Sequence, residues 1–181
     1  SLVGSEMCIR DSKKAIKEFP DYHGRIYVNI DDTGLGGGVT DRLREVKRED
    51  KLSRLYVVPI NAAEKIETDT KAGKDAAEHY NNLTTHMWAV LKDLMENQEI
   101  EIEEDSETFA QLSSRKYFLA SNGKLELESK KEMKKRGLDS PDRGDAAALS
   151  VYLGKIKKYT GSAPNQANTD GLGKSSYWKN R

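Results

Sequence analysis

Two adjacent carboxylates, Asp31 and Asp32, are the first residues in this sequence that could do chemistry. They follow a run in which Ile26, Val28 and Ile30 alternate with polar residues, and this alternation predicts a strand. Ligands of α/β folds bind beyond the carboxyl ends of strands, which is where the two acids stand. Aspartate is also common in turns because it hydrogen-bonds to its own backbone. The stretch by itself therefore leaves both a metal site and a turn open.

A second pair of carboxylates begins a predicted helix near the other end of the chain. Ser140 is expected to cap this helix and Pro141 to occupy its first position. An acid on a buried helix face is costly unless something pairs with it, and a metal ion would do so. The helix dipole explains Asp142 well and Asp145 less well, so we favour a functional role for Asp145. One stripe of the helix holds Asp142, Asp145, Leu149, Tyr152 and Ile156.

Four glycines follow the first acidic pair and predict a sharp turn before a helix. They are Gly34, Gly36, Gly37 and Gly38. A dinucleotide-binding motif would need a glycine where Val39 stands, and a phosphate-binding loop would need Gly-Lys-Ser or Gly-Lys-Thr. A nucleotide-binding α/β protein is therefore the least favoured of the functions considered.

Carboxylates without histidine or cysteine suit hard cations such as Mg²⁺ or Mn²⁺. If Asp31 and Asp145 meet in space, two such ions about 3.5–4 Å apart could activate a water and stabilise the leaving oxygen of a phosphodiester. A basic segment from Arg115 to Arg143 would then hold a DNA backbone without reading its sequence. A non-catalytic metal site is equally compatible with the spacing. The residues expected to contact DNA are Lys130, Lys131, Lys134, Lys135, Arg136 and Arg143.

The composition is that of a polar chain of 181 residues with a formal net charge of zero. Eight acids and no base lie in 93–107, whereas 115–158 holds twelve bases and six acids, so a local basic face is expected despite the balanced total. Such charge runs are more often solvated helix faces. A single cysteine excludes a disulfide within the chain, and no apolar run is long enough to span a membrane.

The periodicity predicts an α/β domain over 13–160, and we expect a non-native leader over 1–12 before it and a flexible tail over 161–181 after it. The segments 25–30 and 55–59 are expected to be parallel strands joined by a helix over 39–47, in a right-handed unit. One long helix is expected over 75–97. Asn122-Gly123 predicts a hairpin between 116–120 and 124–128. Other expected elements are a helix ending at Glu18, a short strand at Ile100 and Ile102, and a helix over 107–113.

Several of these motifs together resemble the nuclease domain of tailed-phage terminase large subunits. Ile30-Asp31-Asp32-Thr33-Gly34-Leu35-Gly36-Gly37-Gly38 is similar to the acidic strand and turn of that family. Tyr80-Asn81-Asn82-Leu83 is similar to its next helix, and Lys124-Leu125-Glu126-Leu127-Glu128 with Ser140-Pro141-Asp142-Arg143-Gly144-Asp145 to its closing segment. The order and spacing agree over roughly residues 20–158.

The resemblance implies an α/β fold of the RNase H-like type, a mixed sheet flanked by helices that lacks its first strands. It implies a two-metal endonuclease that cuts concatemeric viral DNA in the cytoplasm of the bacterial host, with the terminase small subunit and the portal as partners. Asp31 would be the second acidic ligand and Asp145 the third, with Asp142 accessory and Asn29 supporting Asp31 on the same strand face.

The sequence departs from that family at the first catalytic aspartate, which has no counterpart on an upstream strand, because Asp11 and Asp21 are not on strand patterns. The motor ATPase domain has no counterpart either. The alternative function is accordingly a non-catalytic DNA-binding module of the same fold, inactive for want of one metal ligand.

Overall fold

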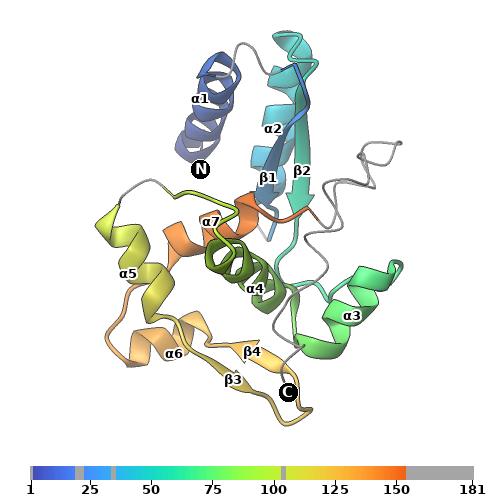
Figure 1. Cartoon of the computed structure of the whole chain (residues 1–181). Coiled ribbons are helices and arrows are strands. Elements are labelled where there is room, and N and C mark those ends of the chain that lie inside the picture. The colour runs from blue at the N-terminus through green and yellow to red at the C-terminus, as the bar shows by residue number, and fades with distance from the viewer. Residues whose placement is uncertain (1, 19–22, 34–35, 103–104, 154–181) are drawn as a thin grey trace. The chain divides into compact units, whose positions relative to one another are not determined.

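The computed structural model describes residues 2–18, 23–33, 36–102 and 105–153, and of residues 2–8, 15, 36 and 37 only the backbone. The chain divides into two compact units, Ser1–Ala62 and Ala63–Gly154, so we take each unit separately (Figure 1). The elements are α1 (Leu2–Glu18), β1 (Ile26–Asp31), α2 (Gly36–Glu49), β2 (Leu55–Ile60), α3 (Lys71–His79), α4 (Leu83–Glu96), α5 (Ser106–Ser114), β3 (Tyr117–Leu119), β4 (Leu125–Leu127), α6 (Lys130–Lys135) and α7 (Asp142–Ser150).

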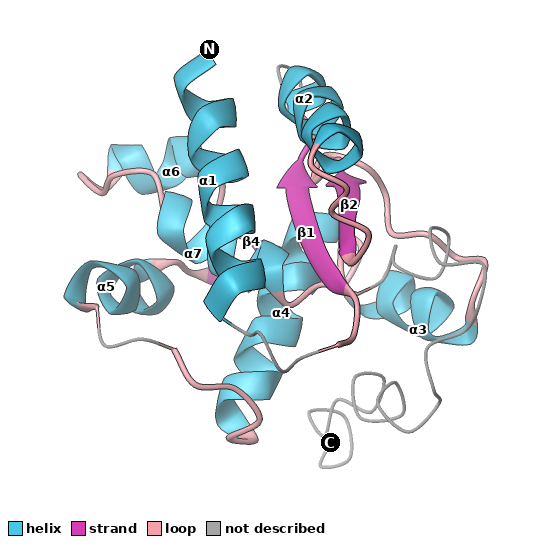
Figure 2. Ribbon diagram, turned by 90° about the horizontal axis from the view of Figure 1, so that it is seen from above, coloured by secondary structure: helices cyan, strands magenta, loops and turns pink. Residues whose placement is uncertain are grey.

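The first unit is a parallel strand pair, β1 and β2, joined by helix α2, as the sequence predicted. The register runs from Ile26 opposite Leu55 to Asp31 opposite Ile60, so the two strands end at the same edge. Helices α1 and α2 lie beside the strands (Figure 2). The core of the unit is formed by Ile9, Ile30, Leu43, Val46, Leu55 and Val57.

The N-terminal residues take part in this unit. Helix α1 begins at Leu2, and Ile9 and Ser12 on it are buried, although 1–12 was expected to lie outside the fold as a leader. Burial of one apolar face against α2 explains the helix, because most helical stability in proteins comes from such packing. The non-native origin of the leader stays a prediction.

The glycine turn is shorter than the sequence predicted. Helix α2 begins at Gly36 rather than at Val39, so Gly36, Gly37 and Gly38 form its first turn, and Gly34 lies outside the described residues. Glycine can adopt helical φ and ψ, and a hydrogen bond of 2.9 Å from the buried Thr40 hydroxyl to Asp32 Oδ1 fastens the first part of the helix to the end of β1.

The second unit contains a helix break that the sequence did not predict. The expected long helix over 75–97 is two helices, α3 and α4, because Tyr80 is extended and its neighbour Asn81 donates a backbone hydrogen bond to Leu125 O of β4. Asn82 then caps α4 by accepting from the backbone N–H of Thr85 at 2.8 Å. Three apolar side chains of α4, Leu83, Met87 and Leu91, are buried.

The hairpin prediction is confirmed, since β3 and β4 pair antiparallel and Gly123 adopts a φ of +79° in the turn between them. The strand predicted at Ile100 and Ile102 is wrong, because residues 99–102 are irregular. Helix α7 begins one residue later than predicted, at Asp142, with Pro141 in the capping position and no side-chain cap. Ile156 and the expected tail over 161–181 lie outside the described residues.

The α/β class with helices flanking the strands is confirmed, and the strands form one parallel and one antiparallel pair in two small sheets. None of the helices within the described ranges combines the length and the apolar character that crossing a bilayer requires.

His86 predicts a pH-dependent stability for the second unit. Its ring stacks on Tyr80 at 5.3 Å and meets the edge of Tyr152 at 5.9 Å, and burial lowers the pKa of His86 to about 4. The unfolded chain therefore binds a proton at a higher pH than the folded chain, and stability is lost as the pH falls from about 6.5 towards 4. We expect urea unfolding to show a free energy about 2 kcal/mol lower at pH 5 than at pH 7.5.

The test variant is His86→Phe, which keeps an aromatic ring beside Tyr80 and Tyr152 and should remove most of the difference in unfolding free energy between pH 5 and pH 7.5. His79→Gln should leave it in place. An unaltered pH dependence in His86→Phe would contradict the assignment.

Candidate functional site

The first unit presents its carboxylates at the shared end of β1 and β2. Asp31 is the last residue of β1 and is exposed, and its Oδ1 accepts a hydrogen bond of 3.0 Å from the backbone N–H of Thr33. The Thr33 hydroxyl donates in turn to Asn61 Oδ1, just beyond β2, at 3.3 Å. The loops after both strands are thus tied together, and the Asp31 carboxylate is positioned at the strand end where α/β folds bind ligands.

Asp31 and Asp32 are equally good candidates in the sequence, but their carboxylates have different hydrogen-bond partners in the structure. The Asp32 carboxylate is held by Thr40 at the start of α2, which gives it a structural role in joining strand and helix. The Asp31 carboxylate faces solvent and forms an Asp-type turn with Thr33. The turn that the sequence left open is therefore observed at Asp31, and the metal site stays a prediction.

Asp145, in the first turn of α7, contacts three side chains of the second unit. Its Oδ1 accepts hydrogen bonds from Trp88 Nε1 at 2.8 Å and from Arg115 Nη1 at 2.7 Å. Its Oδ2 lies 2.9 Å from Lys130 Nζ. Three elements distant in sequence therefore converge on one carboxylate, whose side chain is 27% exposed.

The Arg115 guanidinium is the buried partner in this network, with only 5% of its side chain exposed. It lies over the Trp88 ring at 4.8 Å and donates through Nε to the carbonyl of Glu128. Burial lowers the pKa of Arg115, while the charge and hydrogen bond of Asp145 act in the opposite direction. A cation and an anion at these distances in a half-buried setting hold each other in place.

Gly144 allows α7 to approach α4 at this point. A Cβ at position 144 would lie 2.7 Å from Trp88 Cη2, which is closer than packed carbon atoms come. The small residue therefore allows Trp88 to reach Asp145.

Lys130 joins the two acids of α7. Its Nζ lies 3.2 Å from Asp142 Oδ1 and 2.9 Å from Asp145 Oδ2. Burial by itself would lower the pKa of Lys130, but its hydrogen bonds and charge interactions with the two acids outweigh burial and raise it. The Ser140 hydroxyl and then Lys130 lower the pKa of Asp142, which is exposed. The structure thus brings Asp142 and Asp145 together around one lysine.

The basic residues predicted to contact DNA fall into two groups. Arg136 binds the buried Glu128 through Nε at 2.7 Å, and Arg143 binds Asp105 and Glu107 of the α5 region at 2.7 and 2.8 Å. Within the part of the chain that the structure describes, no ion pair is formed by three exposed lysines of α6. These lysines, Lys131, Lys134 and Lys135, are the ones available to an external anion.

The donors suit a hard cation, because Asp31 and Asp145 offer carboxylate oxygens and Asp142 lies beside Asp145. Over residues 2–18, 23–33, 36–102 and 105–153, however, no three histidine, cysteine, aspartate or glutamate side chains gather closely enough to hold an ion. In this structure the Asp145 carboxylate forms ion pairs with Arg115 and Lys130. The chemistry of these carboxylate donors suits Mg²⁺ or Mn²⁺.

Comparison with solved structures identifies the fold. The nuclease domain of the large terminase subunit gp2 of bacterial virus Sf6 matches with a TM-score of 0.61 and 18% sequence identity, over 82% of this chain and 72% of that one. The fold is that of a terminase nuclease domain. A variant of that domain with manganese and β-thujaplicinol matches with a TM-score of 0.63 at 18% identity, over the same 82% and 72%.

A variant of the same domain with calcium also matches this terminase nuclease fold, with a TM-score of 0.61 at 17% identity over 82% and 72% of the two chains. No family model matches the sequence, and no curated protein matches it either. The RNase H-like α/β fold that the sequence resemblance implied is thereby confirmed, although fewer than one residue in five is shared.

Sequence patterns missed two residues of the site. Trp88 carries no local pattern typical of a site, and Arg115 was counted only as the start of a basic segment, whereas both hold the Asp145 carboxylate. They lie 57 and 30 positions from Asp145 along the chain. Neither separation is a helix or strand period, so no local pattern could have connected them.

Removal of the Arg115 side chain should destabilise the second unit. Arg115→Ala leaves a half-buried Asp145 with less compensation, and loss of one partner of a buried pair costs about 3–5 kcal/mol. The partial exposure of Asp145 reduces the expected loss to about 2–3 kcal/mol in urea unfolding at pH 7.5. Arg143→Ala is the control, because its pairs are largely exposed and are worth at most about 1 kcal/mol. Equal losses in the two variants would contradict the role of Arg115.

Proposed function

We propose that this chain is the nuclease part of a viral DNA-packaging terminase and that it cleaves double-stranded DNA with the help of divalent cations. The observation that carries the proposal is the terminase nuclease fold, combined with an exposed carboxylate at the end of β1 in the position where such folds bind ligands. The sequence motifs of the same family point in the same direction.

Asp31 and Asp145 are the proposed metal ligands, with Asp142 in an accessory position. Bound Mg²⁺ or Mn²⁺, as two ions in the RNase H-like scheme, would supply an activated water and stabilise the charge on the leaving oxygen. The chain itself would orient the two carboxylates: the backbone N–H of Thr33 donates a hydrogen bond to Asp31, and the indole N–H of Trp88 donates one to Asp145. Lys130 occupies Asp145 Oδ2, so this lysine must give way if that oxygen is to bind an ion.

Concatemeric viral DNA in the cytoplasm of the bacterial host is the proposed substrate, and the terminase small subunit and portal are the proposed partners. These assignments rest on the family resemblance. The solved Sf6 gp2 domains with manganese and with calcium are consistent with the use of a divalent cation.

The test of cleavage is nicking of supercoiled plasmid by the purified chain. We expect nicking with Mn²⁺ that EDTA abolishes and that falls at least about a hundredfold in Asp31→Ala and in Asp145→Ala. Asp139→Ala, which removes an exposed acid outside the proposed ligand set, should retain full activity. Undiminished nicking in both ligand variants would exclude the assigned roles.

The second candidate function, a DNA-binding module without cleavage, is favoured by the exposed lysines of α6. It predicts that the wild-type chain binds duplex DNA but nicks nothing under any metal condition. The same plasmid experiment therefore separates the two functions.

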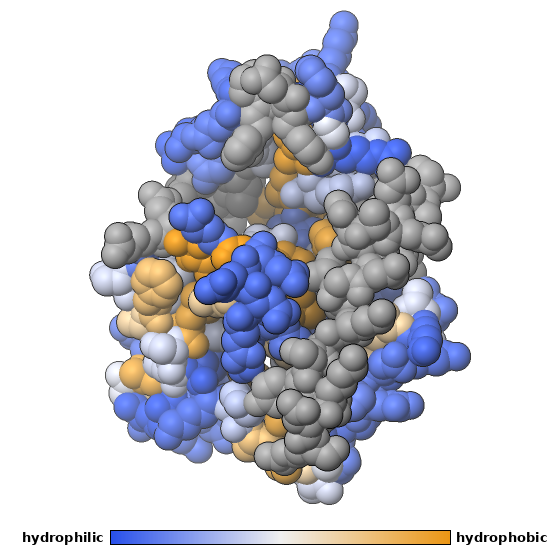
Figure 3. Space-filling model, viewed as in Figure 1, coloured by the Kyte–Doolittle hydropathy of each residue, from blue (hydrophilic) through white to orange (hydrophobic). Residues whose placement is uncertain are grey.

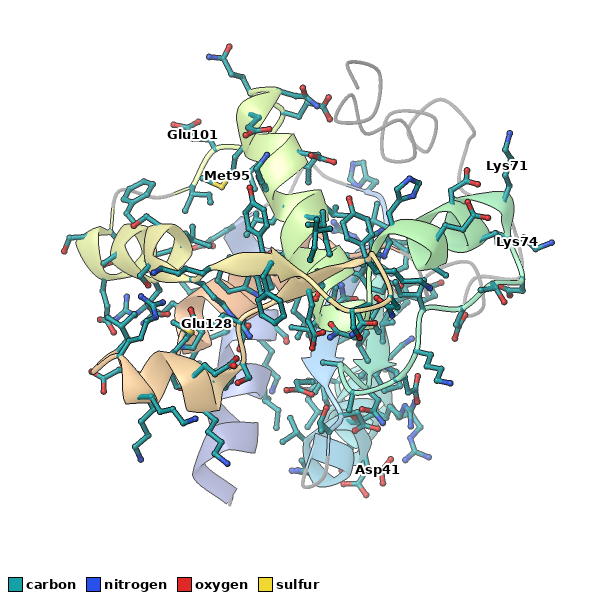
Figure 4. All side chains as sticks on the ribbon, turned by 90° about the horizontal axis from the view of Figure 1, so that it is seen from below. Asp41, Lys71, Lys74, Met95, Glu101 and Glu128 are labelled. Atoms are coloured by element: carbon teal, nitrogen blue, oxygen red, sulfur yellow. The ribbon has the colours of Figure 1, made fainter. Side chains whose placement is uncertain are left out.

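DNA binding itself should depend on Lys131, Lys134 and Lys135. Replacing all three by alanine should lower the slope of log affinity against log salt by about 2–3 if each lysine neutralises one phosphate. Fluorescence anisotropy of a labelled duplex at several salt concentrations measures this slope. The matched control is Lys71→Ala with Lys74→Ala on α3, two lysines whose side chains project from that helix (Figure 4). An equal change of slope in the control would contradict a specific role for α6.

A further inference from the structure

The second unit contains a cavity that the proposed nuclease site does not use. It lies between α4, α5 and the β3–β4 hairpin and has a volume of about 450 Å³. Apolar and aromatic side chains form most of its wall, and Met95 at the α4 side is labelled in Figure 4. Its lining includes Trp88, Ala89, Lys92, Phe109, Arg115 and Tyr117.

The size and the wall of this cavity are those of a small-molecule site, since such sites measure roughly 300–1,000 Å³ and are mostly apolar. Two aromatic side chains of its lining remain open to solvent, Phe109 with 41% and Tyr117 with 52% of their surface exposed. Figure 3 shows hydrophobic surface next to hydrophilic surface in the region where Figure 1 places α4 and α5. Covering exposed aromatic surface is the driving force that a ligand would gain here.

The charges around the cavity indicate that its ligand is neutral. Lys92 forms an ion pair of 2.6 Å with Glu96 of the same helix, and Arg115 is paired with Asp145. Both cations of the lining are thus already neutralised by the chain itself. The lining also holds two acids, Asp93 and Glu96, so its formal charges balance. An anionic ligand would have to break one of these pairs, and a balanced wall offers no net charge to attract a cation, whereas an uncharged ring system would only bury apolar surface.

The cavity wall reaches the Asp145 carboxylate through two of its residues. Trp88 lines the cavity and donates its indole N–H to Asp145 Oδ1, and Arg115 lines the cavity and donates to the same oxygen. The arginine also lies against the indole ring. A molecule that displaces either side chain in the cavity must therefore alter the hydrogen bonding of Asp145.

We propose that this cavity binds an uncharged aromatic molecule of one or two rings and that its occupancy is transmitted to Asp145 through Trp88. The lining of the cavity includes none of the proposed metal ligands and none of the α6 lysines, so binding of the molecule itself does not depend on the proposed nuclease activity.

The experiment is a fluorescence titration of the chain with N-phenyl-1-naphthylamine, a neutral probe that brightens in apolar surroundings. We expect saturable binding with one probe per chain. Phe109→Ser, which removes an aromatic wall, and Ala89→Phe, which fills space on α4, should each weaken binding about tenfold. Phe118→Ser is the matched control, because Phe118 is 45% exposed on the same hairpin but does not line the cavity, and its affinity should stay within about twofold.

A second readout follows the indole N–H of Trp88 by two-dimensional NMR, with its signal distinguished from that of Trp178 by Trp178→Phe. We expect the probe to shift the Trp88 signal in step with the fluorescence. Absence of saturable binding, or an equal loss in Phe118→Ser, overturns the site. Binding without a shift overturns the link to Asp145. Probe displacement as the chain dimerises, seen by sedimentation at rising protein concentration, would mean that a second copy fills the cavity and would overturn the small-molecule assignment.

Discussion

The half-buried carboxylate of Asp145 is the constraint on which the second unit depends. Burying an anion costs several kcal/mol unless it is paired and hydrogen-bonded. The chain meets this cost with the Arg115 guanidinium, the Lys130 ammonium and the Trp88 indole N–H. Those three groups come from the segment before β3, from α6 and from α4, so the position of one carboxylate fixes how the helices and the hairpin around it pack.

Several other features of this unit follow from that arrangement. Gly144 is small because Trp88 must pass close to α7 to reach the carboxylate. The hairpin is anchored at its base because Glu128 accepts hydrogen bonds from Arg136 while its carbonyl accepts one from Arg115. The cavity beside α4 is bordered by the same tryptophan and arginine. The basic segment that the sequence assigned to DNA is thus divided. Its arginines, Arg115, Arg136 and Arg143, pair with acids of the protein, whereas the α6 lysines Lys131, Lys134 and Lys135 are exposed to solvent.

The fold of the first unit depends mostly on local sequence patterns, so more of it could be predicted from the sequence. Alternation in 26–31 and the apolar run in 55–59 predicted both strands, their parallel pairing and the end at which Asp31 stands, because strand periodicity and burial are local properties. The predicted start of α2 was wrong because three glycines, which have low helix propensity, form its first turn in a helix that the Thr40–Asp32 hydrogen bond ties to β1. The helix break at Tyr80 was missed for the same reason, since it is set by Leu125 on a distant strand.

The residues of the candidate site also divide into those that local patterns predict and those that only long-range contacts reveal. The sequence could single out Asp31 and Asp145 because acids at a strand end and at a helix start are unusual for their surroundings. It could not show that Arg115 and Trp88 hold Asp145, or that Asp32 is taken up by a threonine. Side-chain partners far apart in the chain become visible only in the folded structure.

Metal binding by both acids is the central claim, and Mn²⁺-induced broadening of backbone amide signals tests it most directly. A paramagnetic ion broadens the signals of nearby residues, so substoichiometric Mn²⁺ should weaken the amides of 31–33 and of 142–146 together, and excess EDTA should restore them. Broadening confined to the acidic stretch 93–107, or broadening at only one of the two segments, would contradict the account.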